Sequence, residues 1–453
     1  MKTFALRFTQ YILQGLTALT IAMGTSSTSA VDLSSVPLTT STATAVRPNL
    51  NFVLDDSGSM GWDYMPDHVS ISPGQVFVQK LCRSIANNWN DAYCYAGDPP
   101  FANSDFNGVY YNPNITYTAP VNGDGTFKPD QFRMLSGVKK WDLVKTDPFN
   151  SSSSLTINVE TQVPDRVWCN TNSKSSISSS VSYSNSTSPT STVCRRNGYA
   201  YNVPLTSAGY NYPNSTYKYL ASDYVSASLS NSAPYYYTVA SIQWCKDTTL
   251  LSCQVRKDPT YQYAKYGAFT RRDITLASCP STSGCPVSGR TYENEMTNFA
   301  NWYAYYRIRL SMAKSSVGRA FASLDDSYRV GFMTIHTTAP GPLYLPITTF
   351  NPANKVTWYN KLYGITASGG TPLREALSTA GRMFAGKVLT DPVEYSCQKN
   401  FTILSTDGYW NGSALPLTVG GAAIGNVDNS AARPKYDGGL LPTTSAGDRK
   451  SVV

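Results

Sequence analysis

The stretch NFVLDDSGSM, residues 51–60, joins a run of apolar residues to a group of acidic and hydroxyl side chains. The apolar part is typical of a buried β-strand. Asp55, Ser57 and Ser59 follow at alternate positions, with Gly58 between the serines. Carboxylate and hydroxyl oxygens are ligands for hard divalent cations, so the end of this strand is a candidate metal site. The same spacing also fits a capped turn.

The first 30 residues have the pattern of a secretory signal peptide. A basic start is followed by an apolar stretch from about Ile12 to Met23, and small residues lead to Ala30, after which we expect cleavage. No later stretch approaches the roughly 20 apolar residues that a membrane-spanning helix needs. We therefore expect an exported protein with no integral membrane segment once the signal is removed. Residues 31–48, rich in Ser, Thr and Val, are predicted to be a linker.

The composition is that of an extracellular protein with a polar but weakly charged surface. Only 15% of the residues are charged, while tyrosine occurs 32 times. The net charge of +8 is spread along the chain rather than gathered in basic runs. A nucleic-acid-binding groove would need clustered Lys and Arg, so we expect no nucleic-acid partner.

The nine cysteines suit an oxidising compartment. Eight of them fall into couples that are close in sequence, and pairing of neighbours is the simplest expectation, although sequence alone does not prove connectivity. The couples are Cys82 with Cys94, Cys169 with Cys194, Cys245 with Cys253, and Cys279 with Cys285; Cys397 is left unpaired. With no CxxC motif and only two histidines, a zinc site is not expected.

The middle of the chain differs from its ends. From residue 61 to about residue 290, helical periodicity is absent and short Tyr-, Val- and Thr-rich segments alternate with turn residues. We predict one large, mostly β and irregular insertion that is held by local disulfides. Its two serine-rich stretches, 151–154 and 172–192, are predicted to be flexible loops.

Regular elements are predicted on both sides of this insertion. A strand is expected at 49–54, a long amphipathic helix over roughly 293–324, a strand at 328–336 and another within 400–410. A further helix is expected to begin with Thr371 as N-cap and Pro372 as its first residue. This alternation of strands and helices indicates an α/β domain with a largely parallel sheet.

The long helix carries many aromatic residues, and two interpretations of them are open. Trp302, Tyr305 and Arg307 could form a binding stripe on its surface. Packing of an amphipathic helix against a core explains most of the pattern more simply.

Polar side chains occur at three places in this predicted domain: after the first strand, at the start of the second helix and after the last strand. Ligand sites of such sheets form at the carboxyl ends of the strands. We therefore expect one metal site that takes three hydroxyls and two carboxylates, from Asp55, Ser57, Ser59, Thr371 and Asp407. Mg²⁺, which prefers octahedral oxygen coordination, fits this set best, with Mn²⁺ or Ca²⁺ as alternatives. One coordination position would stay open for an acidic group from a partner.

This combination of D-x-S-x-S, a Thr and an Asp resembles the metal-ion-dependent adhesion site of von Willebrand factor A domains. The resemblance implies that Ser57, Ser59 and Thr371 bind the metal through their hydroxyls. It implies that Asp55 and Asp407 act directly or through water. The expected A domain is discontinuous, with residues 49–60 and 291–447 on either side of the insertion at 61–290.

A wider resemblance covers most of the chain. The segments YYNPNITYTAPVNGDGTF (110–127), NFANWYAYYRIRLSMAKSSVGRAF (298–321), GGTPLREAL (369–377) and TDGYWNG (406–412) are similar to the PilY family. Members of that family are adhesins and assembly factors at the tip of type IV pili. The resemblance implies a metal-dependent adhesion and assembly module, located at a pilus tip, on the cell surface or at the outer membrane. Its partners would be minor pilins and a host or surface ligand with an acidic group.

Two other functions remain open from the sequence. A secreted A-domain adhesin could bind a host or matrix ligand without any pilus. A metal-dependent hydrolase would need a general base near the metal, and Asp56 is the only spare acid in the first loop. The two histidines, His68 and His336, are more simply explained as structural residues. We therefore expect a protein that is not an enzyme.

The end of the chain indicates a fragment of a longer protein. After residue 408 no segment shows useful periodicity, although an A domain needs a further helix and strand, so a sheet edge and a face should be left bare. In the PilY family a segment like ARPKYDGG (432–439) precedes that helix. Residues 448–453 are what a common sequencing-adapter sequence encodes in one frame. The expectation is an incomplete, C-terminally truncated domain.

Overall fold

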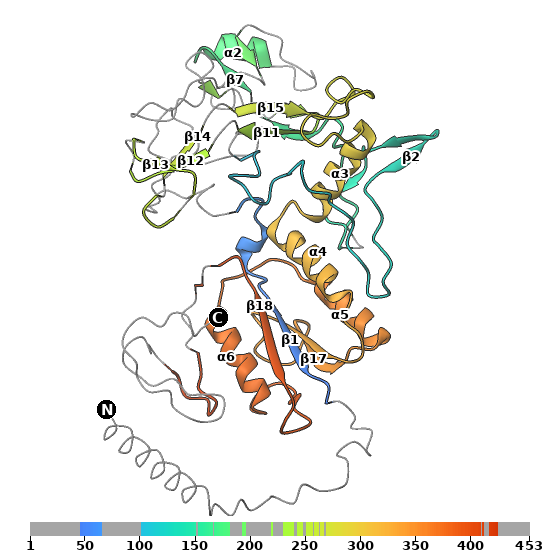
Figure 1. The fold of residues 1–453 in the computed structure, drawn as a ribbon, viewed down its shortest axis with the longest axis vertical. Helices are drawn as coiled ribbons and strands as arrows, with labels where there is room; N and C mark the ends of the chain where they lie inside the picture. Colours follow the sequence, from blue (N-terminus) through green and yellow to red (C-terminus); the bar gives the residue numbers. More distant parts are fainter. Residues whose placement is uncertain are drawn as a thin grey trace, which may run out of the picture. The chain divides into compact units, whose positions relative to one another are not determined.

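Figure 1 shows the fold of the protein in a computed structural model. The structure describes residues 46–65, 101–150, 153–165, 167–181, 193–195, 219–220, 230–239, 242–247, 251–256, 258–261, 263–266, 269–408, 410–411 and 416–424. The expected signal peptide, most of the expected linker, the Cys82–Cys94 couple and the tail at 448–453 lie outside this range. The described residues from Arg47 onward belong to one compact unit. None of the described helices is long and apolar enough to cross a membrane.

A four-stranded sheet forms the centre of this unit. Its order is β17 (Tyr344–Thr349), β16 (Arg329–Thr334), β1 (Asn49–Leu54), β18 (Asn400–Ser405). β1 pairs in parallel with both β16 and β18, while β17 runs antiparallel to β16. The expected α/β fold with a mostly parallel sheet is confirmed. β17 had not been predicted.

Helices cover both faces of this sheet. Because successive side chains of a strand point to opposite faces, Phe52 and Leu54 enter one core while Val53 enters the other. The first core also takes side chains from α4 (Arg309–Phe321) and from α5 (Pro352–Gly364). The second core is closed by α6 (Leu373–Phe384), which lies to the left of β18 in Figure 1, with α4 and α5 on the other side. The carboxyl ends of β1 and β18 therefore emerge together between two helical layers.

The predicted long helix is wrong in one respect, because it is two helices. α3 (Tyr292–Tyr305) ends at Tyr306, and α4 begins after Ile308, which has an extended backbone. The three- and four-residue spacing continues across this break, so periodicity alone did not show it. Trp302 is 3% exposed and Tyr305 is fully buried, so core packing, not a surface stripe, accounts for these aromatic residues.

The start of α6 also differs from the prediction. Pro372 is the N-cap residue and the helix begins at Leu373. Thr371 precedes the cap, and its backbone instead forms an isolated bridge with Asn411. The side chain of Thr371 is thus freed from a capping role. α5 was not predicted, although Asn351 caps it and Pro352 opens it.

The residues between β1 and α3 form short elements, as the sequence predicted for the insertion. A short 3-10 helix, η1 (Gly58–Gly61), follows β1, and every strand pair after it is antiparallel. The strands are β2 (Arg133–Leu135), β3 (Val138–Lys140), β4 (Val144–Lys145), β5 (Thr156–Ile157), β6 (Val163–Asp165), β7 (Trp168–Cys169), β8 (Cys194–Arg195), β9 (Tyr219–Leu220), β10 (Ser230–Ser232), β11 (Tyr235–Val239), β12 (Ile242–Cys245), β13 (Cys253–Gln254), β14 (Tyr263–Tyr266) and β15 (Phe269–Asp273).

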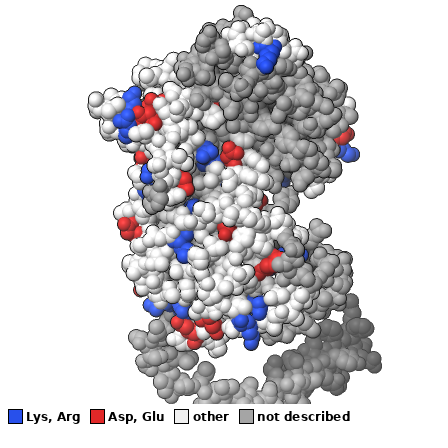
Figure 2. Space-filling model, turned by 180° about the vertical axis from the view of Figure 1, so that it is seen from behind, with Lys and Arg blue, Asp and Glu red and all other residues white. Residues whose placement is uncertain are grey.

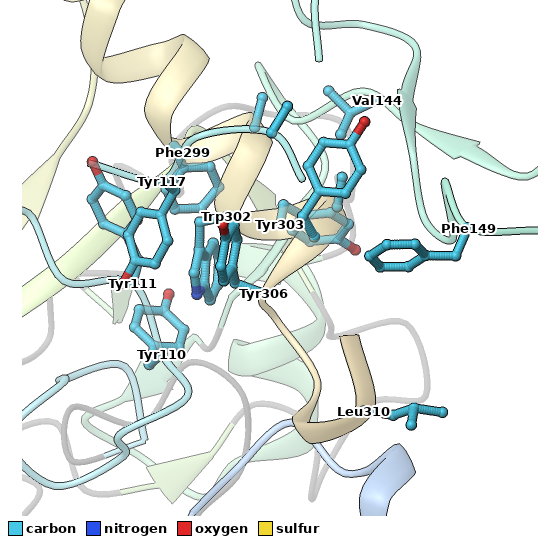
Figure 3. Close-up of a cluster of buried hydrophobic side chains, with 14 of the residues drawn as sticks. Tyr110, Tyr111, Tyr117, Val144, Phe149, Phe299, Trp302, Tyr303, Tyr306 and Leu310 are labelled. Atoms are coloured by element: carbon cyan, nitrogen blue, oxygen red, sulfur yellow. The ribbon is translucent and has the colours of Figure 1, made fainter. Parts of the chain in front are cut away.

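A cluster of aromatic rings packs this region against α3 (Figure 3). The Tyr111 ring centroid lies 5.1 Å from that of Phe299 and 5.7 Å from that of Trp302. The indole N–H of Trp302 donates to the backbone carbonyl of Val109 at 2.9 Å. The abundant tyrosines of the insertion are therefore, in this cluster, core residues rather than a binding surface.

Three disulfides are present in the described residues, and each joins a couple expected from the sequence. They are Cys169–Cys194, Cys245–Cys253 and Cys279–Cys285, and Cys397 is a free, exposed cysteine. One of the serine-rich stretches was wrongly predicted to be a loop, because it contains α2 (Lys174–Val181). Ile177 of this helix is fully buried against the Cys169–Cys194 bridge, which gives the helix a small core of its own.

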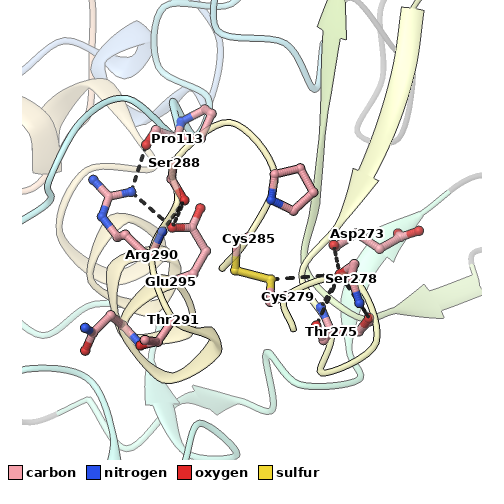
Figure 4. The surroundings of a disulfide bond; sticks show 12 residues. Pro113, Asp273, Thr275, Ser278, Cys279, Cys285, Ser288, Arg290, Thr291 and Glu295 are labelled. Carbon is pink, nitrogen blue, oxygen red and sulfur yellow. Dashed lines mark hydrogen bonds and ion pairs between the residues drawn. A yellow bond between two sulfur atoms is a disulfide. The ribbon is translucent and has the colours of Figure 1, made fainter. Parts of the chain in front are cut away.

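Next to the Cys279–Cys285 bridge, a buried carboxylate anchors the start of α3 (Figure 4). Glu295 is fully buried, and its two oxygens accept from the Tyr111 hydroxyl at 2.7 Å and from Arg290 at 3.0 Å. Arg290 also donates to the carbonyl of Pro113 at 2.7 Å. These bonds fix the 111–113 segment to the beginning of α3.

Candidate functional site

The loop after β1 holds three of the predicted ligand residues side by side. The Ser57 backbone N–H and hydroxyl both donate to one carboxylate oxygen of Asp55, at 2.9 Å and 2.5 Å. The Ser57 and Ser59 hydroxyl oxygens are 3.1 Å apart. A hydroxyl that donates its proton to a carboxylate keeps its lone pairs available for a cation. The local geometry of D-x-S-x-S is therefore suited to an oxygen-ligated metal.

A second loop, which leads from α5 to α6, lies against the first. The Gly58 N–H donates to the carbonyl of Gly369 at 3.0 Å, and the Ser368 N–H donates to the carbonyl of Asp56 at 2.7 Å. Gly369 has φ of +79°, a left-handed conformation that suits glycine. Two residues later, Thr371 is 4% exposed, and its hydroxyl has no hydrogen bond to another described residue. These backbone bonds bring the loop that holds Thr371 against the loop that holds Ser57 and Ser59, which we call the serine loop.

A third segment comes from the end of β18. The Thr406 hydroxyl donates to the second carboxylate oxygen of Asp55 at 2.7 Å, which ties the ends of β1 and β18 together. Asp407 follows, but its carboxylate turns to Arg309, at 2.6 Å from a guanidinium nitrogen. The Asp407 and Arg309 side chains are 5% and 3% exposed. The Arg309 contact was not foreseen, because no sequence pattern links the start of α4 to this loop.

Arg309 also connects this segment to the start of the insertion. Its Nε donates to the carbonyl of Tyr64 at 2.7 Å, and its backbone N–H donates to the carbonyl of Trp62 at 3.0 Å. The guanidinium carbon lies 5.1 Å from the Trp62 ring centroid, a cation–π distance. One arginine therefore links Asp407 to the chain that leaves the serine loop.

A second buried acid in the first loop has a histidine partner. Asp56 is 3% exposed, and one of its carboxylate oxygens lies 2.7 Å from Nδ1 of His336, which follows β16. Burial raises the pKa of Asp56, while the hydrogen bond and the charge of His336 oppose that rise. Although 280 positions separate the two residues, the fold joins them. The sequence identified Asp56 as a spare acid and did not predict its partner.

The donor set fits a hard cation better than a soft one. The described residues contain no group of three or more His, Cys, Asp or Glu that could hold a metal. The side chains that meet in the β1 loop are instead the hydroxyls of Ser57 and Ser59, with the Asp55 carboxylate bonded to Ser57. Oxygen ligands of this kind suit Mg²⁺, Mn²⁺ or Ca²⁺. Asp407 could join such a set through water or by leaving Arg309.

Charged side chains are sparse on the described part of the face shown in Figure 2. On the face shown in Figure 2, Lys and Arg lie singly or in small groups among uncharged residues, with Asp and Glu between them. No broad basic surface is visible in the described part of that face.

The chain is similar to curated proteins named "Type IV pilus biogenesis factor PilY1" from Pseudomonas aeruginosa. It is 26% identical over 400 residues to the protein of strain UCBPP-PA14 and 24% identical over 403 residues to that of strain PAK. Each match covers 85% of this chain but only 24% and 25% of the relatives. The chain thus spans about a quarter of the length of the curated relatives it matches. No family model and no solved structure matches it significantly.

These matches confirm the resemblance to PilY-type pilus factors that the sequence motifs indicated. They span far more of the chain than the metal-site motif alone.

Proposed function

We propose that this chain is an adhesion and assembly module of a type IV pilus factor, acting at the pilus tip on the outside of the cell. Similarity to PilY1 proteins over 85% of the chain supports this role. The three described disulfides suit an exported protein, because such bonds persist in oxidising compartments. Its partners would be minor pilins and an acidic group on a surface or host ligand.

The second part of the proposal is that the sheet and its helices are a von Willebrand factor A domain. The order β17-β16-β1-β18, with helices on both faces and a long insertion after the β1 loop, is consistent with it. The A domain would comprise residues 49–60 and 291–447. Its metal would lie at the carboxyl ends of β1 and β18, where α/β sheets place ligands.

In this proposal a Mg²⁺ ion is held by Ser57, Ser59 and Thr371 through their hydroxyls. Asp55 would orient the serines and offset part of the charge, and Asp407 would add the second carboxylate. When bound, the metal would supply a Lewis-acidic position for an acidic group of the partner. The observation that carries the proposal is the contact between three separate segments: Asp55 with Ser57, Asp55 with Thr406, and Gly58 with Gly369.

A pilus-assembly experiment tests this function. Pili would be counted on cells in which the gene carries Ser59→Ala and Thr371→Val together, which remove two hydroxyl ligands without changing charge. We expect few or no pili, or pili that no longer adhere, at normal protein level. Normal piliation and adhesion would contradict the metal-dependent role. Adhesion that persists in a strain without pili would favour the secreted, pilus-independent adhesin.

A hydrolytic function is the remaining alternative, and the Asp56–His336 pair is the observation that bears on it. We propose instead that this pair fixes the end of β16 to the serine loop. This assignment would be contradicted if the protein hydrolysed generic ester or phosphate substrates and His336→Gln abolished that hydrolysis.

A further inference from the structure

A pocket of about 630 Å³ lies apart from the predicted metal ligands, between the 122–150 part of the chain and the helices α4 and α5. Its walls come from the 122–128 turn, the 147–150 segment, α4, α5 and the chain after α5. The residues that matter for its chemistry are Lys128, Asp147, Phe149, Lys314, Asn360 and Tyr363. None of the predicted metal ligands lines it. Its volume is within the range of small-molecule sites.

The walls of the pocket are held in place by close contacts. A Cβ at Gly123 would lie 2.5 Å from the Cα of Val356, so the turn approaches α5 as closely as only glycine allows. The Tyr363 hydroxyl donates to the carbonyl of Val121. The Phe149 and Tyr363 rings pack with centroids 4.9 Å apart. The pocket is therefore formed before any ligand arrives.

One of its two lysines is deeply buried. Lys314 is 4% exposed, and its ammonium donates to the carbonyls of Tyr363 at 2.8 Å and Ile365 at 2.5 Å. An ammonium has three donors, so one remains without a partner among the described residues. Burial lowers the pKa of Lys314 to about 8, which leaves it mostly protonated at neutral pH; the Asp147 charge opposes this lowering and the Lys128 charge adds to it.

The other lysine has no hydrogen-bond acceptor among the described residues. The Lys128 ammonium lies 4.8 Å from the Tyr363 ring centroid and 5.8 Å from that of Phe149. Lys314 approaches the same Phe149 ring at 5.2 Å. Two like charges thus gather around one aromatic side chain, with Asp147 as a partial counter-charge. An anionic group at this position would accept hydrogen bonds from the unused N–H donors of both lysines. It would also reduce the electrostatic repulsion between the two ammonium groups.

The remaining lining suits a polyhydroxylated ligand. Asn360 offers an amide to the pocket, and it is accompanied in the lining by Asn122 and Asp124, which both bond Thr126, and by the Phe149 ring. The exposed Asn360 side chain has no hydrogen-bond partner among the described residues. Such a mixture of planar polar groups and aromatic rings can bind hydroxyls and a sugar ring together.

We propose that this pocket binds an acidic sugar, with the sugar carboxylate between Lys128 and Lys314 and the hydroxyls toward Asn360. The site is separate from the proposed metal site. Binding would give the module a second recognition element, for the carboxylated glycans of surfaces.

The test is calorimetric titration of the full chain in the presence of EDTA, so that its result does not depend on a metal. Glucuronic acid is the probe, glucose is the neutral match, and inorganic phosphate is the anion without a sugar. We expect glucuronic acid to bind and glucose to bind far more weakly. Equal binding of glucose, binding of phosphate alone, or no binding of glucuronic acid would each overturn the proposal.

Variants then locate the site. Lys128→Gln should weaken glucuronic acid binding by about tenfold or more, the usual value of a charge-assisted hydrogen bond. The fold should not change, because the Lys128 ammonium holds no described hydrogen bond. Lys128→Arg should retain most of the affinity. Lys387→Gln makes the same charge change at an exposed residue outside the pocket and should have no effect. Equal losses in Lys128→Gln and Lys387→Gln would refute the site.

Discussion

The Asp407 carboxylate lies 2.6 Å from the guanidinium of Arg309, although the two residues are 98 positions apart in the sequence. The pair is almost wholly buried, and it lies next to the Thr406–Asp55 hydrogen bond at the end of the sheet. A divalent cation beside Asp55 would compete with Arg309 for Asp407. In the proposed metal-bound state, the ion would therefore supply Asp407 with the positive charge that Arg309 supplies in this structure.

Removal of the Arg309 charge should lower the stability of the protein. Arg309→Gln leaves a buried carboxylate without its partner, which costs on the order of 3–5 kcal/mol of stability. Urea unfolding measures the loss, and added Mg²⁺ should recover more stability in this variant than in the wild type. Arg374→Gln is the control, because Arg374 is exposed and, among the described residues, its side chain only stacks on Trp410. Equal losses of stability in both variants would show that the buried Arg309–Asp407 pair does not stabilise the fold more than an exposed arginine does.

The buried Glu295 should be far more important than its neighbour on the same helix. Glu295→Ala removes the acceptor of Tyr111 and the counter-charge of Arg290, and we expect a loss of about 3 kcal/mol or more. Glu293→Ala, at an exposed position of α3, should change stability by only about 0.5 kcal/mol. Chemical denaturation of the two variants is the measurement. Similar stabilities would contradict the role of Glu295 in fixing the insertion.

The disulfides should stabilise the insertion more than the sheet. Cys169→Ala with Cys194→Ala opens a loop of sequence separation 25, which the entropic model values at about 3 kcal/mol. We expect protease cleavage near α2 to accelerate, while cleavage near β16 stays unchanged. Faster cleavage in the sheet would contradict this division. Peptide mapping without reduction would also test the Cys82–Cys94 couple, which lies outside the described residues.

Lys314 should make stability depend on pH. Burial holds its pKa at about 8 in the folded protein, below its ordinary value of 10.5. Between these values the unfolded chain binds more protons, so this group makes the folded state more stable as pH rises. Relative to Lys314→Met, the wild type should gain at most about 1 kcal/mol per pH unit between about pH 8 and pH 10. A stability difference between the two proteins that does not change with pH would contradict the buried charge.

The strands that frame the candidate site could be predicted from local pattern. β1, β16 and β18 are apolar runs that end in turn or polar residues, and α6 has apolar residues on one face. α5 had a usable signal that was overlooked, namely Asn351 as cap and Pro352 as first residue. β17 was missed because Pro346 interrupts it and its apolar residues alternate weakly.

Other features could not be predicted locally, because they depend on contacts across the fold. The break between α3 and α4 lies in an unbroken apolar pattern, and Arg309 meets Trp62 only in three dimensions. The Asp56–His336 and Arg309–Asp407 pairs join distant segments. The positions of Asp55, Ser57 and Ser59 followed from sequence, but the direction of the Asp407 side chain depended on a residue that no motif contains.

The central claim is that the hydroxyls of the β1 loop hold a divalent cation. The most direct measurement is calorimetric titration of Mg²⁺ into the wild-type chain and into Ser57→Ala, with Ser327→Ala, at an exposed turn far away in sequence, as the control. We predict one Mg²⁺ site in the wild type and in Ser327→Ala, and an affinity lower by about tenfold or more in Ser57→Ala, as expected for the loss of a metal ligand. Unchanged Mg²⁺ affinity in Ser57→Ala, or no binding to the wild type, would contradict the account.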